Sequence, residues 1–200
     1  MENNDQSTVS LDLETLWDHV FTVHPLVIIG SMDDEETPNF APKHMAFPVG
    51  WDRYFGFVCT PAHSTYQNIR NFDEFTVTYP KPDQVIFTSL TATRRREDDT
   101  KPELETIPRF AASTVAPFFL KEGYFYLECR LHNIIDGFGE NSLILGEVVK
   151  AHADEDYIRK NARDDNELIY NHPLMAYLNP GRFAVVDESQ AFPFPKKFRK

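Results

Sequence analysis

The chain has 200 residues, of which 42% are hydrophobic and 14% aromatic, a composition typical of one folded domain with a substantial core. Its formal net charge of −11 argues against nucleic acid or an anionic membrane as a partner, because no long-range positive field would attract a polyanion. A small anion remains compatible with this charge if positive groups gather locally. The basic run 94–96 is expected to be largely cancelled by the acidic residues 97–99 that follow it.

We expect no secretory signal in the N-terminal residues. No basic segment precedes an apolar stretch there, and no apolar run in the chain reaches the roughly 18 residues of a membrane span. We expect residues 1–24 to form a polar arm and a helix, because residues 10–14 carry an N-cap signature with acidic residues. Four apolar residues would share one face of that helix: Leu13, Leu16, Trp17 and Val20.

The chain between residues 26 and 79 is predicted to hold four strands and one short helix. The first run is wholly apolar, as in a strand buried on both faces, and it is expected to pair with the second as a hairpin. The helix should begin near Ser64, which forms a capping-box pattern with Gln67. The four strands are expected at 26–31, 40–47, 53–60 and 74–79, and the helix at 64–71.

The second half of the chain contains the strongest hairpin signal. Two long strands, 123–135 and 141–153, are joined by Asp-Gly-Phe-Gly-Glu. Residues 82–96 are expected to form a helix and loop, 97–117 an irregular excursion, and 154–171 a polar, partly helical segment. Many strands and few helices favour a closed or nearly closed antiparallel barrel over a doubly wound α/β sheet, and no G-x-G-x-x-G follows any strand.

The segment between Cys59 and Asn68 is rich in hydroxyl, imidazole and amide groups and contains no acid. In one interpretation Ser64 caps the helix and the other polar groups face water. In the other, free N–H groups at the helix start act with the neighbouring side chains to hold a phosphate. Helix N-termini bind anions because unsatisfied donors and the positive dipole end point the same way.

Five short motifs then occur in a recognisable order. They read NFAP at 39–42, TYQNIR at 65–70, EFTV at 74–77, LECRL at 127–131 and LGEVV at 145–149. This order resembles that of the flavin reductase-like family of FMN-binding split barrels, whose corresponding motifs are N-x-A-P, T-x-x-N-I-R, E-F-V-V-N, L-E-C-R-L and L-G-E-V-V. The similarity runs from about residue 25 to residue 153.

The resemblance implies a mainly β fold with a few helices, an antiparallel FMN-binding split barrel of Greek-key type. It also implies a homodimer that binds one FMN per subunit at the dimer interface. We expect the barrel domain at 25–183 and a C-terminal tail at 184–200, whose aromatic rings either pack on the partner subunit or are disordered.

Carried over position by position, the resemblance also implies where the flavin binds. The first motif and the residues after it would line the ring and ribityl chain: Asn39, Ala41, Pro42, Lys43, His44, Met45 and Ala46. Cys59 and Thr60 would lie beside the ribityl chain. The phosphate would lie near His63, Ser64, Thr65 and Asn68. Many members have a hydroxyl residue where this chain has His44, which can still donate a hydrogen bond.

The implied activity is that of an NAD(P)H-dependent flavin reductase, with hydride transfer from nicotinamide to flavin N5. Because the cofactor performs the difficult step, no side chain need be indispensable, and His44 and His172 are the candidate catalytic groups. The reductant would be NADH or NADPH, and a monooxygenase or other acceptor could receive the electrons. One alternative is an FMN-binding electron-transfer or sensing protein without nicotinamide turnover. The other is an interaction module that has lost flavin.

The remaining candidates are interpreted as structural. Cys59 and Cys129 lie in apolar runs and are expected to be reduced core thiols of a cytoplasmic protein. The histidines match no ligand spacing, so we expect no metal. Glu128 and Arg130 flank Cys129 on the opposite face of their strand, where a cross-strand ion pair is expected rather than a catalytic role.

Overall fold

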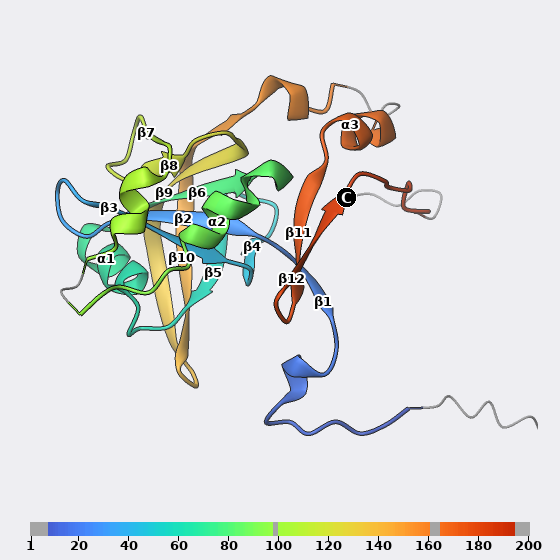
Figure 1. Ribbon diagram of the computed structural model, residues 1–200, viewed down its shortest axis with the longest axis horizontal. Helices are drawn as coiled ribbons and strands as arrows, with labels where there is room; N and C mark the ends of the chain where they lie inside the picture. Colours follow the sequence, from blue (N-terminus) through green and yellow to red (C-terminus); the bar gives the residue numbers. More distant parts are fainter. Residues whose placement is uncertain (1–7, 98–99, 161–164, 195–200) are drawn as a thin grey trace, which may run out of the picture.

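A computed structural model describes residues 8–97, 100–160 and 165–194 of the chain (Figure 1). Its largest sheet is antiparallel and has the strand order β3-β2-β6-β9-β10-β5-β4. These strands are β2 Val27–Met32, β3 Pro38–Lys43, β4 Ala46–Pro48, β5 Tyr54–Cys59, β6 Glu74–Pro80, β9 Gly123–Phe138 and β10 Asn141–Ala153. The two edge strands, β3 and β4, are separated in the chain only by His44 and Met45, so the sheet curls until its edges approach each other. The predicted antiparallel barrel is confirmed.

Strand β2 is buried on both faces, as its apolar sequence predicted. Val27 and Ile29 belong to the core inside the barrel, with the rings of Phe55, Phe57 and Phe75. The alternate residue, Ile28, belongs to a second core outside the barrel wall, because successive side chains of a strand point to opposite faces. Both cysteines are free and buried, also as expected.

The second core is covered by the segment that the sequence suggested was an irregular excursion. After the 3₁₀ turn η2 Pro82–Gln84 and helix α2 Val85–Leu90, the chain forms η3 Pro102–Thr106 and a small hairpin of β7 Arg109–Ala111 and β8 Phe118–Leu120. Leu104, Ile107 and Leu120 pack on Ile28. The prediction of a loose segment at 97–117 is therefore wrong for its described residues, because Leu104 and Ile107 of this segment pack into the second core.

Gly30 permits this outer layer to lie close to the barrel. A Cβ at that position would come within 2.3 Å of both the Phe118 carbonyl oxygen and the Thr76 hydroxyl. The same hydroxyl donates to the Phe118 carbonyl at 2.6 Å. Only a residue without a side chain therefore allows β8 to pack on β2 and β6 at this point.

The predicted N-terminal α-helix is wrong for the described part of the arm. Residues 10–20 contain only a single 3₁₀ turn, η1 Leu16–Asp18, and Leu13 and Trp17 are 82% and 65% exposed. An isolated amphipathic helix of this length is marginal without a surface to cover its apolar face, and the segment extends away from the barrel (Figure 1).

The strand that follows the arm joins the C-terminal region. Strand β1 Thr22–Pro25 pairs with β11 Leu174–Asn179, which pairs with β12 Arg182–Val186, giving a separate three-stranded sheet. Strand β12 crosses the boundary expected at residue 183. The tail beyond residue 194 lies outside the described residues.

The remaining elements are helix α1 Ser64–Phe72, the turn η4 Glu155–Tyr157 and helix α3 Asp165–Asn171. Among the described residues, no helix is both long and apolar enough to cross a membrane. Arg130 forms a cross-strand ion pair with Glu74 at 3.6 Å, as expected. The cross-strand partner of Glu128 is instead His152, at 2.9 Å.

Candidate functional site

The start of helix α1 is the centre of the candidate site. His63 is the N-cap residue and makes no side-chain capping bond, while Ser64 is the first helical residue. The Gln67 amide donates to the Pro61 carbonyl at 2.7 Å, so the predicted Ser64–Gln67 capping box is wrong. No acceptor among the described residues takes the backbone N–H of Ser64 or Thr65. Two donors therefore remain available at the positive end of the helix dipole.

A cavity of about 530 Å³ opens at this helix start, and we call it the anion pocket. Three parts of the chain line it: Asn39, Ala41, Pro42 and Lys43 of β3; residues 62–65 at the start of α1; and residues 91–95 with Lys101 of the outer layer. Four lining side chains are cationic: Lys43, Arg94, Arg95 and Lys101. The pocket thus concentrates positive charge locally in a chain of strongly negative net charge.

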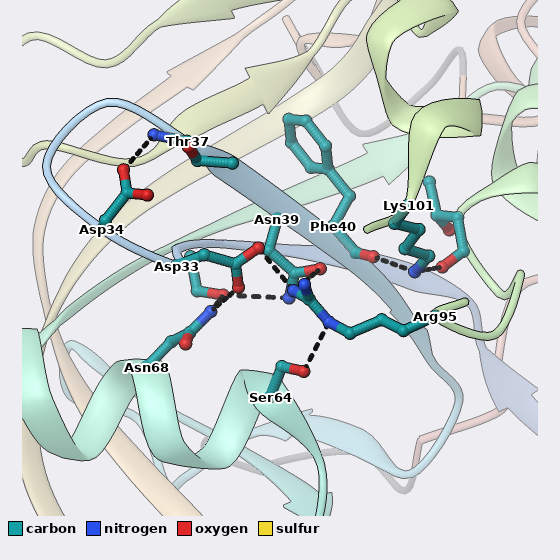
Figure 2. Close-up of polar contacts among 11 residues, drawn as sticks. Asp33, Asp34, Thr37, Asn39, Phe40, Ser64, Asn68, Arg95 and Lys101 are labelled. Carbon is teal, nitrogen blue, oxygen red and sulfur yellow. Dashed lines mark hydrogen bonds and ion pairs between the residues drawn. The ribbon is translucent and has the colours of Figure 1, made fainter. Parts of the chain in front are cut away.

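Arg95 connects the two walls of the anion pocket (Figure 2). Its Nε donates to the Ser64 hydroxyl at 2.8 Å, and its guanidinium forms an ion pair with Asp33. Asn68, from within α1, donates to the same Asp33 carboxylate at 2.8 Å and to the Ser31 hydroxyl at 3.1 Å. The arginine is therefore held in place at the pocket wall, with part of its charge balanced by Asp33.

Lys101 closes the pocket from the outer layer. Its Nζ donates to the Thr91 carbonyl at 2.6 Å and to the Phe40 carbonyl at 3.1 Å, joining the loop after α2 to β3 (Figure 2). Burial, together with repulsion from Arg95, lowers the pKa of Lys101 to about 8. Burial and the nearby Lys43 also lower the pKa of His63, which favours the neutral form of its imidazole.

Seven of the thirteen predicted cofactor-binding residues line the anion pocket: Asn39, Ala41, Pro42, Lys43, His63, Ser64 and Thr65. The others lie around it. Ala46 and Cys59 are buried in the barrel core, and burial raises the pKa of the Cys59 thiol. Met45 is exposed at the barrel corner, and the Thr60 hydroxyl donates to the Asn141 side chain at 3.2 Å. Asn68 acts through Asp33, as described above.

His44 lies in an adjoining recess of about 310 Å³, which shares Pro42 and Ala92 with the anion pocket. We call it the aromatic recess, because the His44, Tyr177 and Phe183 rings form much of its wall. His172 lies elsewhere. It lines a separate cavity with Tyr124 and Tyr157, so the two candidate catalytic histidines are not brought together within this chain.

Sequence reasoning missed Arg94, Arg95 and Lys101. The run of three arginines was the available signal, but the acids that follow it were expected to cancel its charge. Of the described residues in this stretch, Arg94 and Arg95 line the pocket, whereas Glu97 is exposed and does not line it. Which charges share a cavity is decided by tertiary contacts between residues far apart in the chain, such as Arg95 with Ser64 and Asp33, which are 31 and 62 residues away.

The barrel and its cation-lined pocket define a split-barrel protein with a site suited to a compact anion. Comparison with known families agrees: residues 21–178 match the flavin reductase like domain. The chain belongs to this family. An uncharacterized protein of Methanothermobacter thermautotrophicus is 28% identical over 138 residues, which are 66% of this chain and 64% of that protein. The match thus spans slightly less than two thirds of the relative.

Solved structures share the fold. A protein with a split barrel domain from Shewanella frigidimarina aligns with a TM-score of 0.78 and 16% identity, covering 93% of this chain and 95% of the other. Nitrilotriacetate monooxygenase component B from Bacillus cereus gives 0.76 and 19%, covering 96% and 98%. The FMN-binding protein from Thermus thermophilus gives 0.72 and 18%, covering 92% and 97%. Similarity at these identities establishes the split-barrel fold.

Proposed function

We propose that this protein is an FMN-dependent oxidoreductase of the flavin reductase type, with the FMN phosphate bound in the anion pocket. The observation that carries the proposal is the convergence of free helix N–H groups with four cationic side chains in one cavity. Each charge-assisted hydrogen bond to a phosphate contributes about 1.5–3 kcal/mol. A few such bonds can hold the nucleotide although the chain as a whole is acidic.

The residues present fit this cofactor in three ways. The Ser64 and Thr65 N–H groups supply donors for phosphate oxygens, and Lys43, Arg94 and Arg95 supply charge. The neighbouring aromatic recess has room beside the pocket for part of a flat ring system. The cofactor named for the Thermus thermophilus structure is also FMN.

Bound in this pocket, FMN would supply the redox chemistry, with NADH or NADPH as the source of the hydride. The residues of the chain would bind and orient the cofactor. Arg95 and Lys101 would hold the phosphate of the cofactor. Asn39 and Lys43 of β3 line the part of the anion pocket that leads toward the barrel corner. Burial and repulsion from His24 and Lys43 lower the pKa of His44, which favours its neutral form, and its imidazole would offer a hydrogen bond at that corner. We place His172 outside this machinery.

We also propose a homodimer, in which the partner subunit completes the site. Apolar side chains near it remain exposed in the single chain, among them Met45, Phe47 and Phe183. Exposed apolar surface of this kind marks association sites. Sedimentation of the FMN-loaded protein should give a dimer, and a stable monomer with full FMN occupancy would contradict it. The reduced flavin would serve an electron acceptor such as a monooxygenase, in keeping with the name of the Bacillus cereus structure.

The phosphate assignment is tested by Ser64→Asp, with Ser64→Ala as the matched control. Aspartate is favourable at a helix start, so the fold should persist, but its carboxylate would repel the phosphate and bind Arg95. In fluorescence titrations we expect FMN to bind about 100-fold more weakly to Ser64→Asp, by the loss of roughly two charge-assisted bonds, while riboflavin binding stays unchanged. Equal losses for both flavins would contradict the assignment.

The enzymatic part is tested separately. NADH or NADPH is added to the FMN-loaded protein without oxygen, and loss of the oxidised flavin absorption is followed with time. Bleaching supports the reductase. An unchanged spectrum would favour an electron carrier or sensor in the same pocket.

A further inference from the structure

The cavity that His172 lines is separate from the flavin site proposed above, and we call it the tyrosine cavity. It has a volume of about 580 Å³ and lies where the start of β9, residues 157–159, helix α3 and residues 189–192 meet. None of its lining residues lines the anion pocket or the aromatic recess, and α3 lies well apart from α1 in Figure 1. A cavity of this volume is large enough for a small organic molecule.

Two polar side chains of the tyrosine cavity have no partner in the protein. Tyr124 lines it from the start of β9, and His172 lines it directly after α3. Among the described residues, nothing forms a hydrogen bond with the Tyr124 hydroxyl or with the His172 ring nitrogens, and neither group is sealed from solvent. Burial raises the pKa of Tyr124 far above its usual range, so the hydroxyl keeps its proton and can donate it. A largely desolvated donor that opens into a cavity favours a ligand with an acceptor.

The aromatic wall that carries this donor is held in place by its neighbours. The Tyr124 ring lies 4.7 Å from the Tyr157 ring at 18°, and the His172 ring lies 5.4 Å from the same Tyr157 ring. The Lys81 ammonium lies 5.2 Å from the centre of the Tyr157 ring, and the Tyr157 hydroxyl donates to the Pro173 carbonyl at 3.5 Å. Because the wall is already ordered, a ligand loses less free energy in fixing it.

The charges of the tyrosine cavity are already balanced. Arg159 donates twice to the Asp165 carboxylate, at 2.9 and 2.7 Å. Among the described lining residues these two are the only arginine, lysine, aspartate or glutamate. A charged ligand would therefore find no unpaired opposite charge, which favours a neutral one. The apolar part of the lining consists of Leu168, Ile169, Leu174, Ala191 and Phe192.

We propose that the tyrosine cavity binds a neutral, largely apolar carbonyl compound, such as an aryl ketone or ester. The carbonyl oxygen accepts a hydrogen bond from Tyr124, and His172 makes the second polar contact. The apolar body packs against the side chains of α3 and Phe192, and the ring wall favours a flat body over a bulky one. This site needs no bound flavin, so its test stands apart from that of the proposed function.

The test uses 4-fluoroacetophenone as the probe and its fluorine NMR signal as the readout, with the full chain both free of flavin and saturated with FMN. Tyr124→Phe removes the free hydroxyl and keeps the ring, and His172→Phe removes the ring nitrogens. Their matched controls are Tyr54→Phe and His132→Phe, a second tyrosine–histidine pair whose rings lie 4.9 Å apart and do not line the cavity. Two comparison probes vary the ligand: 1-ethyl-4-fluorobenzene lacks the acceptor, and 4-fluorobenzoate carries a charge.

We expect 4-fluoroacetophenone to bind at millimolar concentration or tighter, weakened about threefold to tenfold by each cavity variant and unchanged by the controls. Both comparison probes should bind at least about threefold more weakly, and FMN should leave 4-fluoroacetophenone bound. Tyr124→Phe should fold normally, because it removes a hydroxyl that has no partner in the protein.

Four results would overturn the proposal: no fluorine shift, equal effects of the cavity and control variants, equal or tighter binding of either comparison probe, or displacement of 4-fluoroacetophenone by FMN. Displacement would place the probe in the flavin site. A protein that shifts the fluorine signal as expected but binds no FMN would count against the proposed function alone.

Discussion

Two clusters of charged and polar side chains lie against the barrel, and they differ in how completely their groups are paired. At one, the Glu128 carboxylate is fully buried and accepts bonds from the Ser113 N–H and hydroxyl, the Thr114 N–H and the His152 imidazole. At the other, the anion pocket, four cations and two free N–H groups face one cavity, and Asp33 pairs with Arg95 at its wall.

The difference distinguishes a structural cluster from a candidate binding site. Around Glu128 the donors already have their acceptor, and the result is to fasten residues 113–114 to strands β9 and β10. In the anion pocket the donors exceed the acceptors, and the pocket remains open. Surplus donors in a cavity indicate a missing anionic acceptor. The predictions below test this distinction, beginning with the largest effect.

Glu128→Ala should lower the free energy of unfolding by about 2–4 kcal/mol, because four donor groups lose their one buried acceptor at once. Urea unfolding measures the change. The matched control is Glu147→Ala, which breaks a more exposed cross-strand pair with Arg53 and should cost less than about 1 kcal/mol. Similar losses for both would contradict the interpretation of Glu128 as a structural anchor.

The same cluster should make stability depend on pH in the acid range. Burial alone would raise the pKa of Glu128, but the bonds from His152, Ser113 and Thr114 outweigh it and lower the pKa to about 2. A lowered folded-state pKa stabilises the protein above the unfolded value near 4.5, and this contribution is lost as the pH falls toward 2.

The second prediction uses the arginine run as its own control. Arg95→Gln should weaken FMN binding about tenfold to a hundredfold, because it removes a pocket cation and leaves Asp33 uncompensated beside the phosphate. Arg96→Gln should change it less than about threefold, since Arg96 is exposed, lies outside the pocket and pairs with Glu103 at 3.7 Å. Parallel titrations with FMN and riboflavin measure the affinities of both variants. Equal effects of the two variants on FMN would show that the run acts only through general charge.

The two clusters also show how much of the structure could be predicted from the sequence alone. The apolar alternation and the hairpin signal at 136–140 were enough for the barrel, and the polar segment before α1 was enough to locate the anion pocket. Hydrophobic period and turn chemistry are local properties, so they can be read without a fold. The local pattern gave a wrong prediction at the N-terminal arm, because Leu13 and Trp17 have helical spacing but no surface against which to pack.

The cations of the pocket were out of reach for a different reason. Arg95 and Lys101 act through contacts with Ser64, Asp33 and Phe40, which lie 31 to 62 residues away in the chain. Nothing in the run itself distinguishes Arg95, which enters the pocket, from Arg96, which does not. Glu128 was likewise expected only in a cross-strand ion pair. Three of its four donors are the Ser113 N–H, the Ser113 hydroxyl and the Thr114 N–H of the outer layer, whose approach to β9 depends on the tertiary fold.

The smallest expected effect concerns Lys101, whose pKa near 8 places its charge change within reach of ordinary buffers. As the pH rises from 7 to 9.5, Lys101 loses its proton and the pocket loses one positive charge. The phosphate stays doubly charged throughout, since its second pKa is about 6. FMN should therefore bind about threefold to tenfold more weakly at the upper end of the range.

Stability should change with pH in the opposite direction, which makes the Lys101 prediction specific. Because the folded-state pKa lies below the unfolded value of 10.5, the unfolded chain binds more protons between these two values, and the free energy of unfolding rises with pH across that interval. Lys101→Arg keeps its charge at every pH tested, so its FMN affinity should be flat over the same range, and Lys101→Met should be weak and equally flat. FMN titrations of the native protein and the two variants at matched ionic strength measure how the affinity depends on pH. If Lys101→Arg retained the decline of the native protein, the titrating group would be another residue of the pocket, and Lys101 would serve only to join β3 to the outer layer.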